Sequence, residues 1–256
     1  MTRISPRHPR YASLKVRARL ARAARSGLVV PEGLIAQGRG EAFDYLLGER
    51  STPSARRAAR IAAAWIRAAE RPVLSVNGNV AALAAPEIAR LLRALPNLRV
   101  EVNLFHRTEA RVRAVARHLS RAGIDPVLGL HPTARLAHLP SDRARIDADG
   151  IARADLCVIP LEDGDRAEAL HRAGKRVIAI DLNPFSRTAQ RADLAVVDEL
   201  SRALRNITRA AGSRPAALGP VRPSVFLHEA RAAIRRRLPS GPPRTRRSRR
   251  AVRPPR

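Results

Sequence analysis

Six short apolar runs, separated by helical segments, constrain the fold of this chain more than any other feature of its sequence. Helical periodicity fills most of the intervals between the runs, around 84–94, 108–122, 165–173 and 199–210. Apolar strands that alternate with helices indicate an α/β fold, in which helices cover both faces of a mainly parallel sheet. The expected strands are 73–77, 98–104, 126–130, 156–161, 176–182 and 194–198.

The segment before the first strand is expected to be helical, at 13–26, from Pro31 onward and at 54–70. Within the second of these helices, Gly33, Gly38 and Gly40 are poor interior residues. We therefore predict close backbone contacts around Arg39. Small neighbours would also let a phosphate approach that arginine, whereas the simpler interpretation is an ordinary surface charge.

Composition divides the chain into three parts. We expect one folded domain over 1–212, a linker with a short helix over 213–238, and a disordered tail rich in Arg and Pro over 239–256. The net charge is +27, and from residue 202 onward there are sixteen arginines against a single acid, Glu229. The excess positive charge is thus partly a property of the C-terminal region.

Several classes of protein and site are disfavoured. No apolar run approaches the length of a membrane span. Cys157 is the only cysteine, which predicts a reduced, cytoplasmic setting. The seven histidines lack metal-ligand spacing, so no zinc site is expected. Neither the phosphate-binding loop nor the glycine-rich dinucleotide fingerprint is present, so any nucleotide would be bound by other means.

Polar side chains follow four of the predicted strands. Because the carboxyl ends of parallel strands meet at one edge of a sheet, these clusters predict a small-molecule site. The clusters are Asn77-Gly78-Asn79, then Glu101, Asn103, His106 and Arg107, then Glu162, Asp163, Asp165 and Arg166, and finally the 181–188 stretch with Asp181, Asn183, Ser186, Arg187 and Thr188.

Two of these clusters have simpler alternatives. The Asn77-Gly78-Asn79 sequence is also typical of a turn with positive backbone angles. Glu162, Asp163 and Asp165 suit Mg²⁺ or a substrate ammonium, but acids are also favoured at an ordinary solvated helix start. The sequence leaves both pairs of alternatives open.

Six long segments, in order, carry a family resemblance that covers about residues 4 to 210. Taken together they resemble archaeal 4-phosphopantoate–β-alanine ligase, also called phosphopantothenate synthetase. The C-terminal tail lies outside the resemblance. The segments are HPRYASLKVR, GLIAQGRGEAFDYLLGE, PVLSVNGNVAAL, VEVNLFHRTEAR, ADLCVIPLEDGDRAEAL and GKRVIAIDLNPFSRTAQRADLAVVDE.

The resemblance implies a Rossmann-like homodimeric enzyme of coenzyme A biosynthesis. Such an enzyme uses Mg·ATP to join 4-phosphopantoate to β-alanine, and it yields 4-phosphopantothenate, AMP and diphosphate through an acyl-adenylate. The family's ATP contacts then fall on Arg17, Arg39, Asp181, Leu182, Asn183, Arg187, Thr188, Glu199 and Leu200. Glu199-Leu200 stands where the family usually has Asn-Ile, so an acid replaces an amide near the nucleotide.

The roles of further residues follow from their strand-end positions rather than from the family. Asn77, Asn103 and Arg107 are expected to line the 4-phosphopantoate side. Glu162, Asp163 or Asp165 would hold Mg²⁺ or the β-alanine ammonium. Two rival functions remain: non-specific nucleic-acid binding through the basic tail, and another nucleotide-dependent kinase or ligase on the same fold.

Overall fold

The computed structural model describes residues 4–213 and 222–238. Six strands form one sheet in the order β3-β2-β1-β6-β7-β8, and every pairing in it is parallel. The strand order reverses between β1 and β6, which makes that position the topological switch point of the sheet. The strands are β1 Pro72–Val76, β2 Arg99–Val102, β3 Val127–Leu128, β6 Leu156–Pro160, β7 Arg176–Ile180 and β8 Leu194–Val196.

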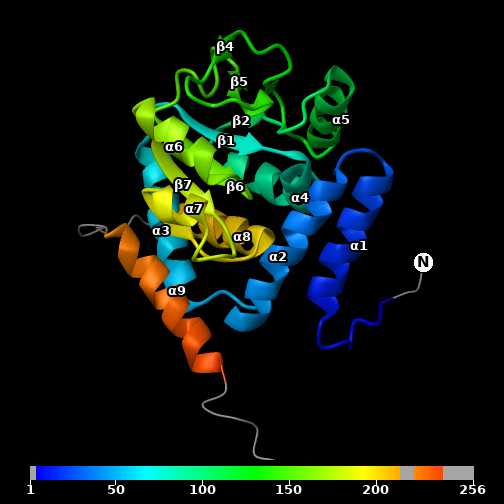
Figure 1. Cartoon of the computed structure of the whole chain (residues 1–256), viewed down its shortest axis with the longest axis vertical. Helices are drawn as coiled ribbons and strands as arrows, with labels where there is room; N and C mark the ends of the chain where they lie inside the picture. The colour runs from blue at the N-terminus through cyan, green and yellow to red at the C-terminus, as the bar shows by residue number, and fades with distance from the viewer. Residues whose placement is uncertain (1–3, 214–221, 239–256) are drawn as a thin grey trace, which may run out of the picture.

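Helices cover both faces of this sheet (Figure 1), so the predicted Rossmann-like α/β fold is confirmed. Alternation along the strands builds two cores: Leu74 and Ile178 face α3, α4, α5 and α8, whereas Cys157 and Val177 face α6. The helices are α1 Tyr11–Arg25, α2 Pro31–Leu47, α3 Pro53–Ala68, α4 Gly78–Ala94, α5 Glu109–Ser120, α6 Gly164–Arg172, α7 Arg187–Arg191, α8 Leu200–Ala211 and α9 Pro223–Arg237.

The helical N-terminal segment is also confirmed. Helices α1 and α2 lie side by side at one flank of the molecule, and α3 packs against α8 (Figure 1). Thr52 caps helix α3, since its hydroxyl accepts a hydrogen bond from the amide of Ala55, and Pro53 is the first residue of the helix. These start signals agree with the helix predicted from residue 54.

Three local predictions were incomplete or wrong. Helix α4 begins at Gly78, six residues before the predicted start, because the Asn77 side chain caps it by accepting from the amide of Val80. The turn interpretation of Asn77-Gly78-Asn79 is therefore wrong. The short helix α7 was not predicted. The small antiparallel pair of β4 Ala134–Arg135 and β5 Arg145–Ile146 was not predicted either, and the 3-10 helix η1 Asp142–Ala144 lies between these two strands.

The short helix expected within 213–238 is present as α9. It packs against the end of the sheet through Leu227, Ala230 and Ile234, which form a core with Leu182 and Val197. The predicted linker lies largely outside the described residues, and the predicted disordered tail at 239–256 lies wholly outside them.

Between residues 4 and 213 and in α9, no helix combines the length and the apolar character that a bilayer span requires.

Candidate functional site

The carboxyl ends of β2, β1, β6 and β7 lie next to one another in the sheet, so the four predicted polar clusters meet at one edge. At the switch point, Asn77 follows β1 and its amide nitrogen donates to the carbonyl oxygen of Leu161, which follows β6, at 3.0 Å. Asn77 therefore ties the two halves of the sheet together and also starts α4. Gly78 fits here because a Cβ would lie 2.3 Å from the carbonyl oxygen of Leu28.

The end of β6 places charged groups in the interior. The Glu162 side chain has no exposure, and its Oε2 lies 3.0 Å from Arg143 Nη1 without the geometry of a hydrogen bond. Arg143 also pairs with Asp163, whose side chain is 58% exposed, and lies over the ring of Phe105. Burial raises the pKa of Glu162 above its ordinary value, and the charges of Arg143 and Arg166 oppose that shift.

Arg166 is fully buried behind this pair and donates to the carbonyl oxygen of Arg143. Its Nε and Nη2 atoms find no hydrogen-bond acceptor among the described residues. Two buried guanidinium groups therefore compensate the buried carboxylate, and Arg166 fixes the backbone that carries Arg143.

The loop after β7 is held by its own polar side chains. Asp181 accepts hydrogen bonds from the Asn183 amide at 2.9 Å and from the Ser186 hydroxyl at 2.5 Å. Burial raises the pKa of Asp181, while these bonds and the charge of Arg39 lower it. Leu182 is buried and faces Gly40 of α2, whose added Cβ would lie 3.7 Å from Leu182 Cδ1.

Arg187 and Thr188 begin helix α7 in different surroundings. Thr188 is buried and donates through its hydroxyl to the carbonyl oxygen of Glu162 at 2.6 Å, which joins the ends of β6 and β7. The Arg187 side chain is 63% exposed and pairs with Asp165 at 2.8 Å. Gly164 allows this approach, since a Cβ there would lie 2.4 Å from the Arg187 Cβ.

The carboxylate of Glu199 caps the helix that follows it, α8. Its two carboxylate oxygens accept from the amides of Ser201 and Arg202 at 3.0 Å each, which caps α8. Glu199 and Leu200 are buried. Glu199 therefore has a structural role as the cap of α8, and an acid is favoured at a helix N-terminus.

Arg17 and Arg39 differ in how the fold holds them. Arg17 of α1 contacts both oxygens of Glu41 of α2, at 2.9 and 2.8 Å. Arg39 is exposed and makes no hydrogen bond or ion pair with the described residues, although its charge acts on Asp181. The predicted close contacts around Arg39 are only partly present. Among the described residues, nothing lies within 4 Å of a Cβ added at Gly38, Gly40 has an ordinary contact with Leu182, and the tight approach is at Gly33, against Asn79.

Asn103 and Arg107 follow β2; Asn103 is buried, and so is the side chain of Arg107. The Asn103 amide nitrogen donates to the carbonyl oxygen of Arg145, and Arg107 Nη2 donates to those of Gly129 and Leu130. Asn103 Oδ1 and Arg107 Nε have no hydrogen-bond partner among the described residues. Both side chains thus combine a structural contact with one unused polar atom.

The described residues contain no group of three or more His, Cys, Asp or Glu side chains arranged to hold a metal ion. A cavity of about 510 Å³ lies at the opposite, amino edge of the sheet, where Trp65, Lys175 and Arg176 contribute to its lining. Lys175 is already engaged there, since its Nζ donates to the carbonyl oxygens of Ala152 and Ala154 at 2.9 Å. The unused polar atoms at the carboxyl edge make that edge the better candidate site.

Two arginines at this edge were not predicted. Arg143 lies in a segment without helical or strand periodicity, so the sequence carried no signal for it. Arg202 lies in the first turn of α8 and pairs with Asp198, which precedes the helix, at 2.9 Å.

Comparison with known proteins places the chain in a family. The family model described as phosphopantothenate/pantothenate synthetase matches residues 54–217. Proteins named 4-phosphopantoate–β-alanine ligase are 56% identical over 202 residues in Methanospirillum hungatei, 51% over 214 in Thermococcus onnurineus, and 51% over 209 in Methanosarcina mazei. The alignments cover 79, 82 and 82% of this chain, and 82, 81 and 82% of those relatives. The chain belongs to the phosphopantothenate/pantothenate synthetase family.

Proposed function

We propose that this protein is an ATP-dependent ligase that joins 4-phosphopantoate to β-alanine in coenzyme A biosynthesis, with 4-phosphopantothenate, AMP and diphosphate as products. The observation that carries the proposal is the meeting of four polar strand ends at the switch point of a parallel sheet, in a chain of this family. A reduced, cytoplasmic setting remains our expectation.

The chemistry needs an activated carboxylate, because a carboxylate does not react with an amine unaided. A carboxylate oxygen of 4-phosphopantoate attacks the α-phosphorus of ATP, diphosphate leaves, and an acyl-adenylate forms. The β-alanine nitrogen then attacks the acyl carbon, loses a proton, and releases AMP. Cations are needed in the first step to offset the repulsion between two anions.

For the nucleotide we assign phosphate contacts to Arg17, Arg39 and Arg187. Arg39 is the best supported of the three, since it is exposed and unpaired among the described residues, whereas the other two already contact carboxylates. The 181–183 loop would orient the nucleotide, with backbone contacts at Thr188 and at Glu199-Leu200. Mg²⁺ would arrive with the ATP phosphates, where it supplies further charge compensation.

The three acids after β6 can be given different roles. Asp163 and Asp165 have side chains that are 58 and 63% exposed, so a β-alanine ammonium or a magnesium ion can reach them. Glu162 has no exposed side chain and contacts Arg143, so we assign it to holding that arginine. An Asp163→Asn variant should raise the KM for β-alanine more than the KM for ATP.

On the acyl side, we propose that Asn77, Asn103 and Arg107 line the 4-phosphopantoate site. The unpartnered Oδ1 of Asn103 and Nε of Arg107 support this assignment, because buried polar atoms are normally hydrogen-bonded. Asn77 would act mainly by fixing the backbone after β1 and β6, through its hydrogen bonds with Val80 and Leu161.

The experiment that tests the function incubates purified protein with Mg·ATP, 4-phosphopantoate and β-alanine, and separates the nucleotides by chromatography. We expect AMP, formed together with 4-phosphopantothenate, only when both co-substrates are present. Production of ADP in place of AMP would favour a kinase or an acyl-phosphate ligase and would contradict the proposal.

The family resemblance also leads us to propose a homodimer. Helix α2 exposes apolar side chains that a second copy could cover, including Ile35, which is 67% exposed, and Tyr45, which is 45% exposed. Sedimentation should give twice the chain mass for the protein and the mass of one chain for Ile35→Glu. A monomeric wild type at micromolar concentration would contradict this.

A second function, non-specific nucleic-acid binding, is favoured by one observation: residues 239–256 contain seven arginines and no acid. A chain ending at Leu238 tests it without disturbing α9, which packs on the core. We expect unchanged ligase activity and a loss of salt-dependent affinity for nucleic acid. Equal affinity in the two proteins would remove the tail from consideration.

A further inference from the structure

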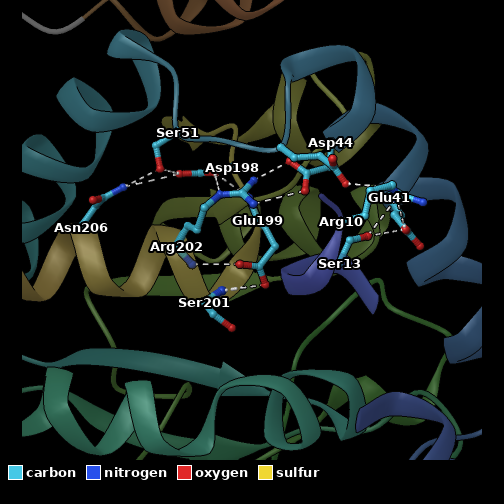
Figure 2. Close-up of polar contacts among 11 residues, drawn as sticks. Arg10, Ser13, Glu41, Asp44, Ser51, Asp198, Glu199, Ser201, Arg202 and Asn206 are labelled. Carbon is cyan, nitrogen blue, oxygen red and sulfur yellow. Dashed lines mark hydrogen bonds and ion pairs between the residues drawn. The ribbon is translucent and has the colours of Figure 1, made fainter. Parts of the chain in front are cut away.

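Helix α2 packs on the end of the sheet through Phe43, Leu46 and Leu47. One arginine of another helix adds a polar attachment. Helix α2 carries Arg39, and through Glu41 it also holds Arg17 of α1. Neither arginine is part of the sheet, so their positions relative to the nucleotide loops depend on what fixes α2. The polar contacts in Figure 2 identify the side chain at the centre of that attachment as Arg202, from α8.

Arg202 contacts one acid on each side. Its Nη1 donates to Asp44 Oδ2 of α2 at 3.2 Å, and its Nη2 also contacts Asp44. Its Nε donates to Asp198 Oδ1, just after β8, at 2.9 Å. The planar guanidinium thus spans α8, α2 and the end of β8, and a lysine could not reproduce that fork.

The two acids that Arg202 contacts are buried, so both depend on its charge. The side chains of Asp44 and Asp198 are 8 and 1% exposed, and Arg202 is the only cation with which either forms an ion pair in the described parts of the chain. Burial raises the pKa of both acids, and Arg202 opposes that shift. Loss of Arg202 would leave two acids close together in the interior without a cation.

The same contacts extend to both neighbouring segments. Asp198 Oδ2 accepts from the Ser51 hydroxyl at 2.5 Å, and Asn206 donates to that hydroxyl at 2.9 Å (Figure 2). On the α2 side, Glu41 lies one turn before Asp44 and accepts from Ser13 of α1 at 2.6 Å. Polar contacts therefore tie α1 to α2 at Glu41, and α2 to the β8–α8 junction at Asp44.

We propose that Arg202 is a positioning residue for ATP binding: it fixes α2, and with it Arg39 and Arg17, relative to the loops that follow β7 and β8. Arg202 itself does not contact ATP. The inference rests on the proposed function in that ATP is taken as the ligand of this edge. It assigns a role to a buried ion-pair network that the proposed chemistry does not use directly.

The test compares Arg202→Gln and Arg202→Lys with Arg205→Gln as a matched control. Arg205 is on the same helix and pairs with Glu87 of α4 at 3.1 Å, away from α2. We expect Arg202→Gln to weaken ATP binding and raise the ATP KM about tenfold or more, because small displacements of binding groups are costly. The KM for β-alanine should stay within about twofold, and Arg205→Gln should change neither constant.

Asp44→Asn keeps the test decisive if Arg202→Gln fails to fold. It loosens only the α2 side of the bridge and leaves the Asp198 contact in place. If Arg202 acts through Asp44, this variant should weaken ATP binding as well, and the double variant Asp44→Asn/Arg202→Gln should be no weaker than Arg202→Gln alone. Arg202→Lys should give an intermediate affinity, because it keeps the charge but not the fork.

Direct calorimetric titration with ATP separates this inference from the proposed function. A wild type that binds ATP but forms no AMP would contradict the ligase function. The ATP titrations of the Arg202 and Asp44 variants would then still test the positioning role. A folded Arg202→Gln variant with wild-type ATP affinity would overturn the positioning role. Equal increases in the KM values for ATP and β-alanine would also overturn it, since they would indicate a general structural effect.

Discussion

Substitution of Arg39 by Gln should separate nucleotide binding from stability. Arg39 is exposed and forms no hydrogen bond or ion pair with the described residues, so the folded chain loses no contact of that kind when it is replaced. The expected change in the free energy of unfolding is within about 0.5 kcal/mol, as for an ordinary surface substitution.

The effect on ATP should be much larger. A hydrogen bond to a charged group contributes about 1.5–3 kcal/mol, which corresponds to a rise of about 10- to 150-fold in the ATP KM. Arg39→Lys retains the charge and should lose less. The KM for β-alanine should not change.

The assay measures AMP formation against ATP concentration, with thermal unfolding of each variant as the control for folding. An Arg39→Gln protein with the wild-type ATP KM would refute the assignment of a phosphate contact to this residue. A fall in the unfolding temperature similar to that of a core variant would refute the description of Arg39 as unpaired.

Three further predictions concern the body of the fold. Burial raises the pKa of Glu101 to about 7 from 4.5, so between these pH values the folded chain retains a proton that the unfolded chain releases. The free energy of unfolding should therefore fall as pH rises from 4.5 to about 7, and it should fall less steeply in Glu101→Gln. An unchanged slope in that variant would contradict the assignment to Glu101. Burial raises the pKa of Cys157 to about 12, so a disulfide reagent should label it only after unfolding in urea, and rapid labelling of the native protein would be the contrary result. Leu74→Ala, in the centre of β1 with no exposure, should cost about 2–5 kcal/mol by urea unfolding. The exposed Val225→Ala on α9 should cost less than about 0.5 kcal/mol, and similar costs for the two would contradict the burial pattern.

The sheet could be predicted because its strands are apolar on both faces. All six predicted strands are present, and the alternation that separates Leu74 from Cys157 in the two cores follows from strand geometry. The start of α4 was missed for a physical reason. Asn77 and Gly78 are typical of turns, and only the three-dimensional contact of Gly78 with Leu28 shows why glycine is needed in a helix there.

The candidate site could be predicted in its location but not in its internal pairing. Strand ends indicated where Asp181 and Glu162 would lie. Glu162 contacts Arg143, which lies 19 positions earlier in the chain, and Arg202 contacts Asp44, which lies 158 positions earlier. No local sequence pattern specifies contacts between residues so far apart. The cap formed by Glu199 was not predicted either, since this acid was expected only as a nucleotide contact.

The most direct test of the ligase follows an oxygen atom. If 4-phosphopantoate labelled with ¹⁸O in its carboxylate is ligated to β-alanine with Mg·ATP, attack on the α-phosphorus transfers one labelled oxygen to AMP. Mass spectrometry should therefore find one label in AMP and one in the new amide. Unlabelled AMP, or label in inorganic phosphate with ADP as the nucleotide, would contradict the acyl-adenylate route.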